Sequence, residues 1–372
     1  MEKQLPQLQA GLTKMENKES KIYFLTQDTE GRAIASVNLN YQYVKYLNEA
    51  GYNAYILYEK KEYKGVGEWL TKEYVDLPHV NIESGDLKVG PQDLVIVPEI
   101  YGHILEQIKD MPCTKMIFCQ SYDYILETLP PGFGWSNYGV TKCITTTETQ
   151  KERIVSLFPN IECTVIPLSF PDYFKPTKKP KSPMVAVHTR EHRDTAKLIK
   201  EFYLKNPQFK WVTFRDMRNV SREEFANILS ESCVSVWVDR ISGFGTFPLE
   251  SMLSNSPVIG VLPILKADWI TQENGLWVME ESKIVDILGN YIKNWLEGNI
   301  PDKLYEEMKK TVSVFSEDKE RDAVISYFEN LFNERITEFK TSINKLSPVV
   351  QKLTGEPLPS ITETVLTSNY PE

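Results

Sequence analysis

Residues 242–260, SGFGTFPLESMLSNSPVIG, combine residue types that can bind a charged small ligand. Gly243 and Gly245 have no side chains, so their backbone N–H groups can approach a ligand closely. A predicted helix follows, with Pro248 in its first turn, and a helix N-terminus presents free N–H donors and a partial positive charge. Glu250 is expected in the same turn. This combination is typical of a site for a nucleoside diphosphate, whose ribose hydroxyls donate hydrogen bonds to the carboxylate.

The same pattern also has a purely structural interpretation. Acidic residues favour the first turn of a helix because of the helix dipole, and glycine often precedes a helix. The context of the segment favours the ligand. The strand-like run 233–239, CVSVWVD, ends just before it at Asp239, and open parallel α/β sheets bind ligands at the carboxyl edge of their strands.

The elements that must position this segment alternate along the whole chain. Short apolar runs that read as strands are separated by segments with helical periodicity, which predicts parallel sheets covered on both faces. One helix is expected to end at Gly51, and another to begin at Ser221 with a capping box to Glu224. The expected strands lie at 21–27, 52–58, 93–99, 115–120, 143–147, 184–189, 210–214, 233–239, 258–260 and 275–279.

The fold class is therefore α/β, with two doubly wound, Rossmann-like domains facing each other across a cleft. A stretch rich in proline and lysine separates the two halves and is typical of an interdomain linker. The expected boundaries are a polar lead-in at 1–20, a first domain at 21–172, a linker at 173–183, a second domain at 184–318, a further helix at 319–336 and a partly ordered tail at 337–372.

Composition narrows the function classes. The 372 residues are 41% hydrophobic and carry a net charge of −9, which argues against a general polyanion-binding surface but allows a local basic cleft. The five cysteines form no CxxC pair and read as reduced core residues of a cytoplasmic protein. No signal peptide opens the chain, and no apolar run reaches the roughly 18–20 residues of a membrane span. No Asp-x-Asp motif is present, so we expect no metal site.

Residues 211–260 resemble the nucleotide-sugar-binding half of GT-B glycosyltransferases. The closest similarity is to the large retaining family, family-4-like or group 1, that carries two glutamates eight positions apart. In that family Gly-Phe-Gly is followed by Leu-Glu-Ala-Met and then by Pro-Val-Ile. The resemblance covers roughly residues 21–335, with further matching stretches at 145–159, 165–176 and 274–278.

The resemblance implies a function. A sugar would pass from a nucleoside diphosphate, UDP above all, to an acceptor hydroxyl with retention, and no metal or other cofactor would take part. Glu250 matches the family's ribose-binding glutamate, and Ser242 stands where its first glutamate reads the donor sugar. Arg190 matches the first member of a basic pair that neutralises the diphosphate. The second position falls on Thr195, and Arg193 is the alternative cation.

The candidate residues follow from this assignment. On the acceptor side, the first domain offers Gln120, where the family often has a histidine, and Tyr122. His188 and His192 are equally consistent with pocket lining and with ordinary surface. The catalytic candidates are Arg190, Arg193 and Glu250, and the donor-binding candidates are Gly31, Arg190, Arg193, Ser242, Gly243, Phe244, Gly245, Thr246 and Glu250.

A helix that crosses back to the first domain is also implied. It would lie within 319–336, and its buried face would consist of Val324, Tyr327, Phe328 and Leu331.

Two other classes of protein remain open. A nucleotide-sugar epimerase of the same fold would need several acids and bases around the sugar, and the chain has only four histidines. A non-catalytic nucleotide-sugar-binding protein is favoured by Ser242 and Gln120. A turnover assay distinguishes the three. The sequence leaves the acceptor open among glycan, lipid-linked glycan, protein and a modified base in nucleic acid, and it does not set the oligomeric state.

Overall fold

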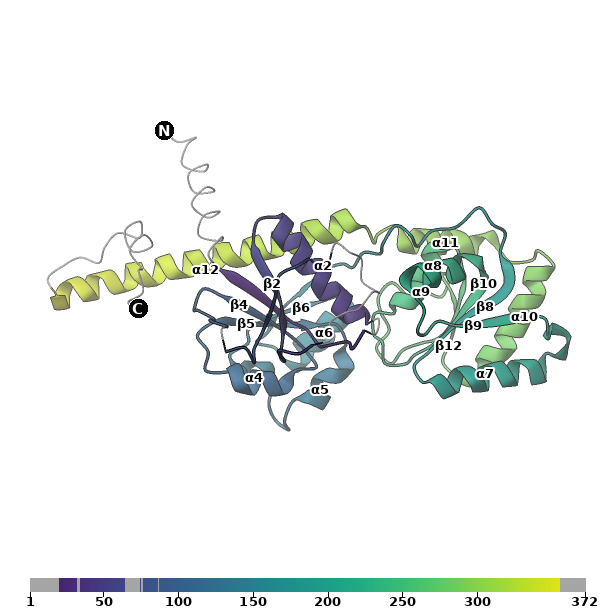
Figure 1. Ribbon diagram of the computed structural model, residues 1–372, viewed down its shortest axis with the longest axis horizontal. Coiled ribbons are helices and arrows are strands. Elements are labelled where there is room, and N and C mark those ends of the chain that lie inside the picture. The colour runs from purple at the N-terminus through teal and green to yellow at the C-terminus, as the bar shows by residue number, and fades with distance from the viewer. Residues whose placement is uncertain (1–19, 32–33, 64–73, 75, 86, 355–372) are drawn as a thin grey trace, which may run out of the picture. The chain divides into compact units, whose positions relative to one another are not determined.

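The computed structural model describes residues 20–31, 34–63, 74, 76–85 and 87–354 (Figure 1). The chain separates into two compact units, one formed by Ser20–Ala323 and one that includes the chain from Val324 onward. Within the described residues, no helix combines the length and apolar character that crossing a bilayer requires.

The first sheet of the larger unit has seven parallel strands in the order β3-β2-β1-β4-β5-β6-β7. Its central strands are almost continuously apolar because both of their faces are buried. The short edge strands β3 and β7 were not expected from the sequence, since neither has a long apolar run. The strands are β1 Lys21–Leu25, β2 Asn53–Tyr58, β3 His79–Asn81, β4 Leu94–Pro98, β5 Thr114–Cys119, β6 Lys142–Thr145 and β7 Glu162–Val165.

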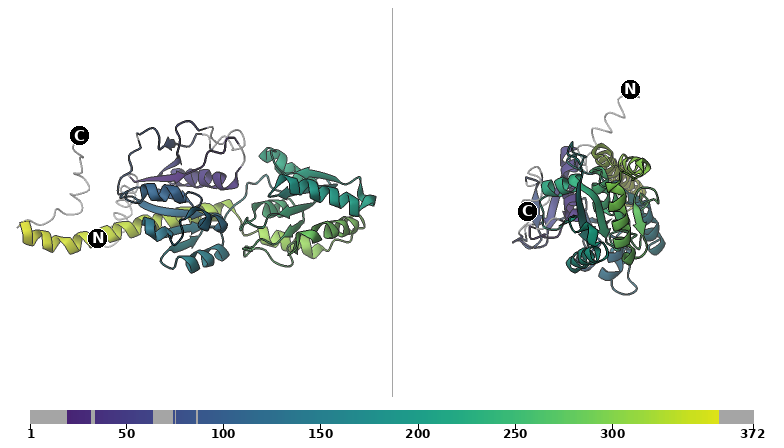
Figure 2. Two further views of the ribbon diagram at one scale, coloured as in Figure 1. Left: turned by 90° about the horizontal axis from the view of Figure 1, so that it is seen from below. Right: turned by 90° about the vertical axis from the view of Figure 1, so that its right-hand side faces the viewer.

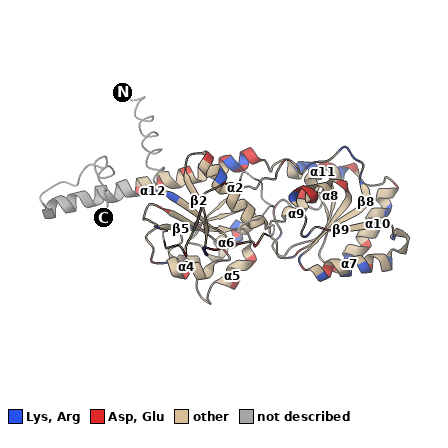
Figure 3. Ribbon diagram, viewed as in Figure 1, with Lys and Arg blue, Asp and Glu red and all other residues tan. Residues whose placement is uncertain are grey.

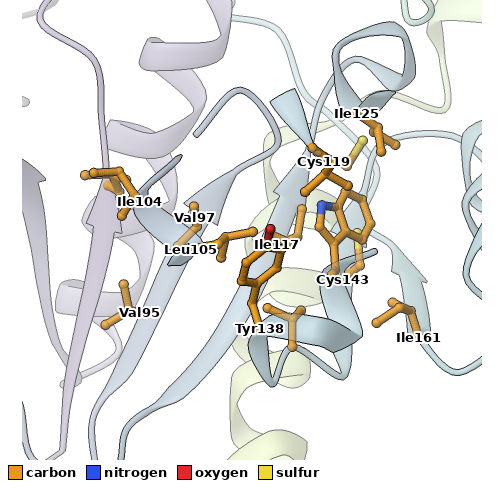
Figure 4. Packing of buried hydrophobic residues seen from close by; sticks show 14 of the residues in the cluster. Val95, Val97, Ile104, Leu105, Ile117, Cys119, Ile125, Tyr138, Cys143 and Ile161 are labelled. Atoms are coloured by element: carbon orange, nitrogen blue, oxygen red, sulfur yellow. The ribbon is translucent and has the colours of Figure 1, made fainter. Parts of the chain in front are cut away.

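Helices and short helical turns connect these strands. The α2 helix ends beside Gly51, whose φ of +89° is the left-handed geometry predicted for the residue after a helix. Between the sheet and its covering segments lies a core in which Ile117 and Cys143 lie close to Leu105 and Tyr138 (Figure 4). The helical elements are α2 Ala35–Glu49, α4 Gly102–Ile108, η2 Tyr122–Tyr124, α5 Ile125–Thr128, η3 Trp135–Tyr138 and α6 Glu148–Leu157.

The second sheet has five parallel strands in the order β12-β11-β10-β8-β9. Helices lie on both of its faces (Figures 1 and 2), with α7 against α10 in one layer and α9 against α8 and α11 in the other. The elements are β8 Ser182–Thr189, α7 His192–Lys205, η4 Pro207–Phe209, β9 Thr213–Asp216, α8 Arg222–Glu231, β10 Ser232–Val238, α9 Thr246–Leu253, β11 Val258–Val261, β12 Leu276–Val278, η5 Glu281–Lys283, α10 Ile284–Leu296 and α11 Asp302–Val312.

Two parallel, helix-covered sheets confirm the predicted α/β fold class. The hydroxyl of Ser221 accepts a bond from the Glu224 backbone at 3.2 Å, so Ser221 caps α8 as predicted. The Glu224 carboxylate accepts from Arg215 at 2.7 Å, and only the Ser221 half of the predicted capping box is formed. All five cysteines are free and buried. Acidic and basic residues are mixed along α7 and α11 (Figure 3).

The last helix, α12, differs from the sequence-based expectation. It runs from Glu317 to Thr354, so part of the segment expected to be a tail from residue 337 is helical. Residues 355–372 and the lead-in at 1–19 lie outside the described part. Of the four residues expected on its buried face, Tyr327 is half-buried and the other three are buried: Val324, Phe328 and Leu331.

Candidate functional site

The carboxyl ends of β8 and β10 lie side by side at the point where the strand order of the second sheet reverses. Thr189 pairs with Val238 across the two strands, and the backbone N–H of Arg190 donates to the Val238 carbonyl at 3.0 Å. Such reversal points are where open α/β sheets bind ligands. The loop after β8 and the loop after β10, fifty residues apart in the chain, therefore form one edge.

Asp239, the residue after β10, organises this edge. One carboxylate oxygen accepts the backbone N–H groups of Ile241 at 2.9 Å and Ser242 at 3.1 Å, and the other accepts the Ser242 hydroxyl. The Arg190 guanidinium lies 3.6 Å from the same carboxylate, which is 95% shielded from solvent. Sequence analysis did not select Asp239. Its position directly after a buried strand was the feature of the sequence that could have indicated a role at the site.

The α9 helix begins without a side-chain cap. Its N-cap residue, Gly245, has φ +75°, and a Cβ there would lie 3.1 Å from the Trp237 ring and 3.2 Å from the Trp269 ring. Only glycine fits this position without strain. Among the residues that the structure describes, no side chain caps the first turn, whose N–H groups begin with Thr246. The predicted run from Ser242 to Thr246 therefore forms one continuous loop into an open helix N-terminus.

The structure separates the two candidate arginines. Arg190 lies between Asp239 and the Tyr124 hydroxyl, to which its guanidinium donates a hydrogen bond. Arg193, in the first turn of α7, has 79% of its side chain exposed and lies 3.9 Å from Asp194. Arg190 is therefore part of the edge network, whereas Arg193 faces solvent.

A second cation at this edge comes from Arg218, which sequence analysis missed. Its guanidinium donates to the Asp216 carboxylate at 2.8 and 3.1 Å and to the Thr195 hydroxyl at 2.7 Å. Thr195 is the position where the resemblance places the second basic residue of the family. A positive charge is therefore fixed beside Thr195 by a residue that follows β9. The signal in the sequence was a basic residue two positions after the end of a strand.

His188, near the end of β8, is half-buried at this edge. Its ring stacks on Phe247 in the first turn of α9, with the centroids 5.1 Å apart. Its Nδ1 is buried and has no hydrogen-bond partner among the described residues. Burial lowers the pKa of His188, so the imidazole is neutral near pH 7. His192, by contrast, is 84% exposed beside Asp216.

Glu250 occupies a different place in α9 from the one predicted. The helix begins at Thr246 and has no acidic residue in its first turn, so Glu250 lies one turn further on. The dipole of the first turn therefore does not account for this acid. Only 4% of the residue is exposed, and its Oε1 accepts a hydrogen bond from the Arg222 guanidinium at 3.0 Å. Within the described part of the chain, Oε2 accepts no hydrogen bond.

The acceptor-side candidates lie after β5 of the first sheet. Buried Glu99 accepts the backbone N–H of Gln120 at 3.1 Å and that of Ser121 at 2.8 Å, and its burial raises its pKa to about 7. The Gln120 side-chain amide donates a hydrogen bond to the Ser36 backbone carbonyl at 3.1 Å. Tyr122 is half-buried at the start of η2. The same η2 turn carries Tyr124, the partner of Arg190, so the two predicted sides meet here.

The other predictions from the sequence concern Gly31 and metal binding. Gly31 has φ +81° in an exposed turn, and its neighbour Arg32 lies outside the described residues. Among the residues that the structure describes, no cluster of three or more His, Cys, Asp or Glu side chains could hold a metal ion. The metal-independence of the chemistry stays a prediction.

Comparison with known proteins identifies the fold and the class of enzyme. No protein-family model matches the chain. A curated relative, an alpha-1,6-glucosyltransferase of Actinobacillus pleuropneumoniae serotype 7 (strain AP76), is 22% identical over 285 residues, which cover 72% of this chain and 83% of the relative.

Solved structures match over most of the chain. Sucrose-phosphate synthase of Thermosynechococcus elongatus has a TM-score of 0.58 at 12% identity, covering 86% of this chain and 100% of its own. TarM has a TM-score of 0.59 at 9% identity, covering 86% and 99%. HepE of Anabaena has a TM-score of 0.56 at 12% identity, covering 86% and 99%.

These structures show the GT-B fold, with its two parallel-sheet domains. Together with the curated relative, they confirm the predicted class, and the chain is a glycosyltransferase of the GT-B fold. The family with two glutamates eight positions apart, and the individual site residues, stay predictions.

Proposed function

We propose that this chain transfers glucose from UDP-glucose to a hydroxyl of an acceptor sugar, with retention and without a metal ion. The observation that carries the proposal is the uncapped N-terminus of α9 at the carboxyl edge of the second sheet. Arg190 lies at the same edge through Asp239, which holds Ser242, and Glu250 follows after the first turn of α9 with one oxygen that no described residue bonds.

The diphosphate is the part of the donor that this edge suits best. The open N–H groups at Thr246 and the partial charge of the helix N-terminus attract an anion. Arg190 and Arg218 add guanidinium donors at the same edge, each held by a carboxylate, that of Asp239 or that of Asp216. His188 adds a buried nitrogen without a partner. A preorganised set of donors of this kind can stabilise a leaving diphosphate in the way that a metal ion does in other transferases.

The choice of sugar and nucleotide draws on two matched proteins. The curated relative is named an alpha-1,6-glucosyltransferase. The HepE structure was solved in complex with UDP-glucose. Because UDP-glucose carries its glucose in α linkage, an α-linked product means that the configuration is retained. We therefore place the 6-hydroxyl of an acceptor sugar first among the candidate nucleophiles.

In this proposal the reaction needs no dedicated protein base. As the glycosidic bond breaks, the β-phosphate gains negative charge, which the α9 N-terminus and Arg190 stabilise. The acceptor hydroxyl attacks from the face that the diphosphate leaves, and its proton passes to the departing phosphate. The η2 turn would hold the acceptor, because Tyr124 of that turn contacts Arg190.

The test is a turnover assay with UDP-glucose and one acceptor of each class: a glucoside, a lipid-linked sugar, a glycosylated peptide and glucosylated DNA. We expect UDP release together with an α-glucosidic product, identified from its anomeric proton coupling, at the same rate with and without EDTA. A β product would refute retention, and loss of activity in EDTA would refute the metal-independent mechanism. Isomerised UDP-sugar would identify an epimerase. Tight UDP-glucose binding without turnover on any acceptor would identify a binding protein.

A further inference from the structure

Arg222, the first residue of α8, is enclosed between the donor edge and the connector of the two sheets. Its guanidinium donates to Glu250 at 3.0 Å and to the Tyr173 hydroxyl at 3.2 Å. The same group lies 5.0 Å from the centre of the Phe174 ring and 5.7 Å from that of Phe225. One side chain therefore joins α8, α9 and the segment before β8.

In this arrangement only one of the two carboxylate oxygens of Glu250 accepts a hydrogen bond from a described residue. The Glu250 side chain is 6% exposed, against 28% for Arg222, so the carboxylate is the more deeply enclosed partner. Its Oε1 is held by Arg222, while Oε2 accepts no bond from any described residue and is not among the fully buried atoms that lack a partner. A carboxylate fixed through one oxygen presents the other in a constant direction.

We propose that Arg222 is a positioning residue for nucleotide binding: it orients the Glu250 carboxylate so that the second oxygen receives the ribose hydroxyls. The inference rests on the proposed function, because it assumes that a nucleoside diphosphate binds at α9. The inference adds a residue of α8 to the ribose-binding site. Because Tyr173 and Phe174 contact the Arg222 guanidinium, the segment before β8 also helps to orient Glu250.

The chemistry of the pocket explains why arginine serves here. A planar guanidinium can bond a carboxylate and a phenol in its plane while its faces contact aromatic rings, and a lysine ammonium cannot do all of these together. Removing the guanidinium would also leave Glu250 as an enclosed charge without its partner, which favours rotation of the carboxylate toward water.

The experiment compares two ligands rather than one affinity. UDP and 2′,3′-dideoxy-UDP, which lacks both ribose hydroxyls, are titrated calorimetrically into the full-length chain and its variants. A hydrogen bond to a charged acceptor corresponds to a preference of about tenfold or more, and we expect the parent to favour UDP by that ratio. In R222M the ratio should fall to about twofold, with dideoxy-UDP binding almost as in the parent. R222K should give an intermediate ratio.

The matched control is R215M. Arg215 bonds Glu224 at 2.7 Å beside the same helix, but both side chains are about half exposed, at 46% and 50%. We expect the parental ratio in this variant. The thermal midpoint is recorded for every variant, because a merely structural Arg222 would lower the midpoint and leave the ratio unchanged.

Two failures are distinguishable. If the parent does not bind UDP, or binds both ligands equally, the proposed nucleotide site or its ribose contact is wrong, and this inference falls with it. If the parent discriminates and R222M discriminates equally well, only the positioning role is overturned. If R222M does not fold, the affinity ratio of UDP to dideoxy-UDP is measured on R222K instead. A parental ratio in R222K would overturn the positioning role of Arg222.

Discussion

Replacing Arg190 with alanine should slow sugar transfer far more than it weakens donor binding. The guanidinium lies 3.6 Å from Asp239 and bonds Tyr124, at the edge where the diphosphate is proposed to leave. Because the leaving group gains negative charge only as the bond breaks, the cation stabilises the transition state more than the ground state.

The magnitude follows from how the residue is held. Losing one preorganised donor to a developing oxyanion costs about 2.7–4 kcal/mol in a water-excluded site. The Arg190 side chain is 36% exposed, so solvent screening places the cost at the lower end, about 3 kcal/mol, or roughly 10²-fold in turnover. The loop should stay in place, because Asp239 keeps its bonds to Ile241 and Ser242.

The assay is the initial rate of UDP release at saturating UDP-glucose and acceptor, with R193A as the matched control. Arg193 lies three residues further on, in the first turn of α7, and is 79% exposed, so its removal should change turnover by less than about threefold. The reasoning would be refuted if R190A turned over at the parental rate, or if R193A lost as much activity as R190A.

Three further changes test the fold around the site. Gly245→Ala should lower the free energy of unfolding by about 2 kcal/mol and weaken UDP binding, because of the φ of +75° and the nearby Trp237 ring; parental denaturation and calorimetry curves would contradict this. Burial raises the pKa of Glu320 to about 7, so its contribution to stability is complete below pH 4.5 and is lost as the pH rises through 7. Urea unfolding between pH 5 and 8 should therefore show a fall of up to about 3 kcal/mol more in the parent than in E320Q, and equal slopes would exclude this. Ending the chain after Ser316 removes Glu320, which bonds Gln42 at 2.7 Å, and should lower the thermal midpoint by about 5 °C or more; an unchanged midpoint would show that α12 is dispensable.

The sequence by itself determined the architecture, because the relevant signals are local. Continuous apolar runs such as that of β10 specify strands buried on both faces, and their alternation with helical periodicity specifies parallel sheets. The end of α2 at Gly51 and the cap of α8 at Ser221 depend on backbone geometry within a few residues. The same local reasoning located the loop from Ser242 to Thr246, since glycines before a helix after a strand need no distant partner to be recognised.

The tertiary structure decided which side chains share the edge. Arg218 reaches Thr195 of α7, and Arg222 of α8 reaches Glu250 of α9, only because these elements pack together, and no periodicity in the sequence records such contacts. Because α9 begins at Thr246, Glu250 lies beyond the first turn in which it was predicted. The start of this helix depends on the left-handed Gly245 and on Trp237 and Trp269, which pack against it. Local propensity fixes where elements form. Electrostatic partners come from side chains on different elements, and only the packing of those elements brings them within bonding distance.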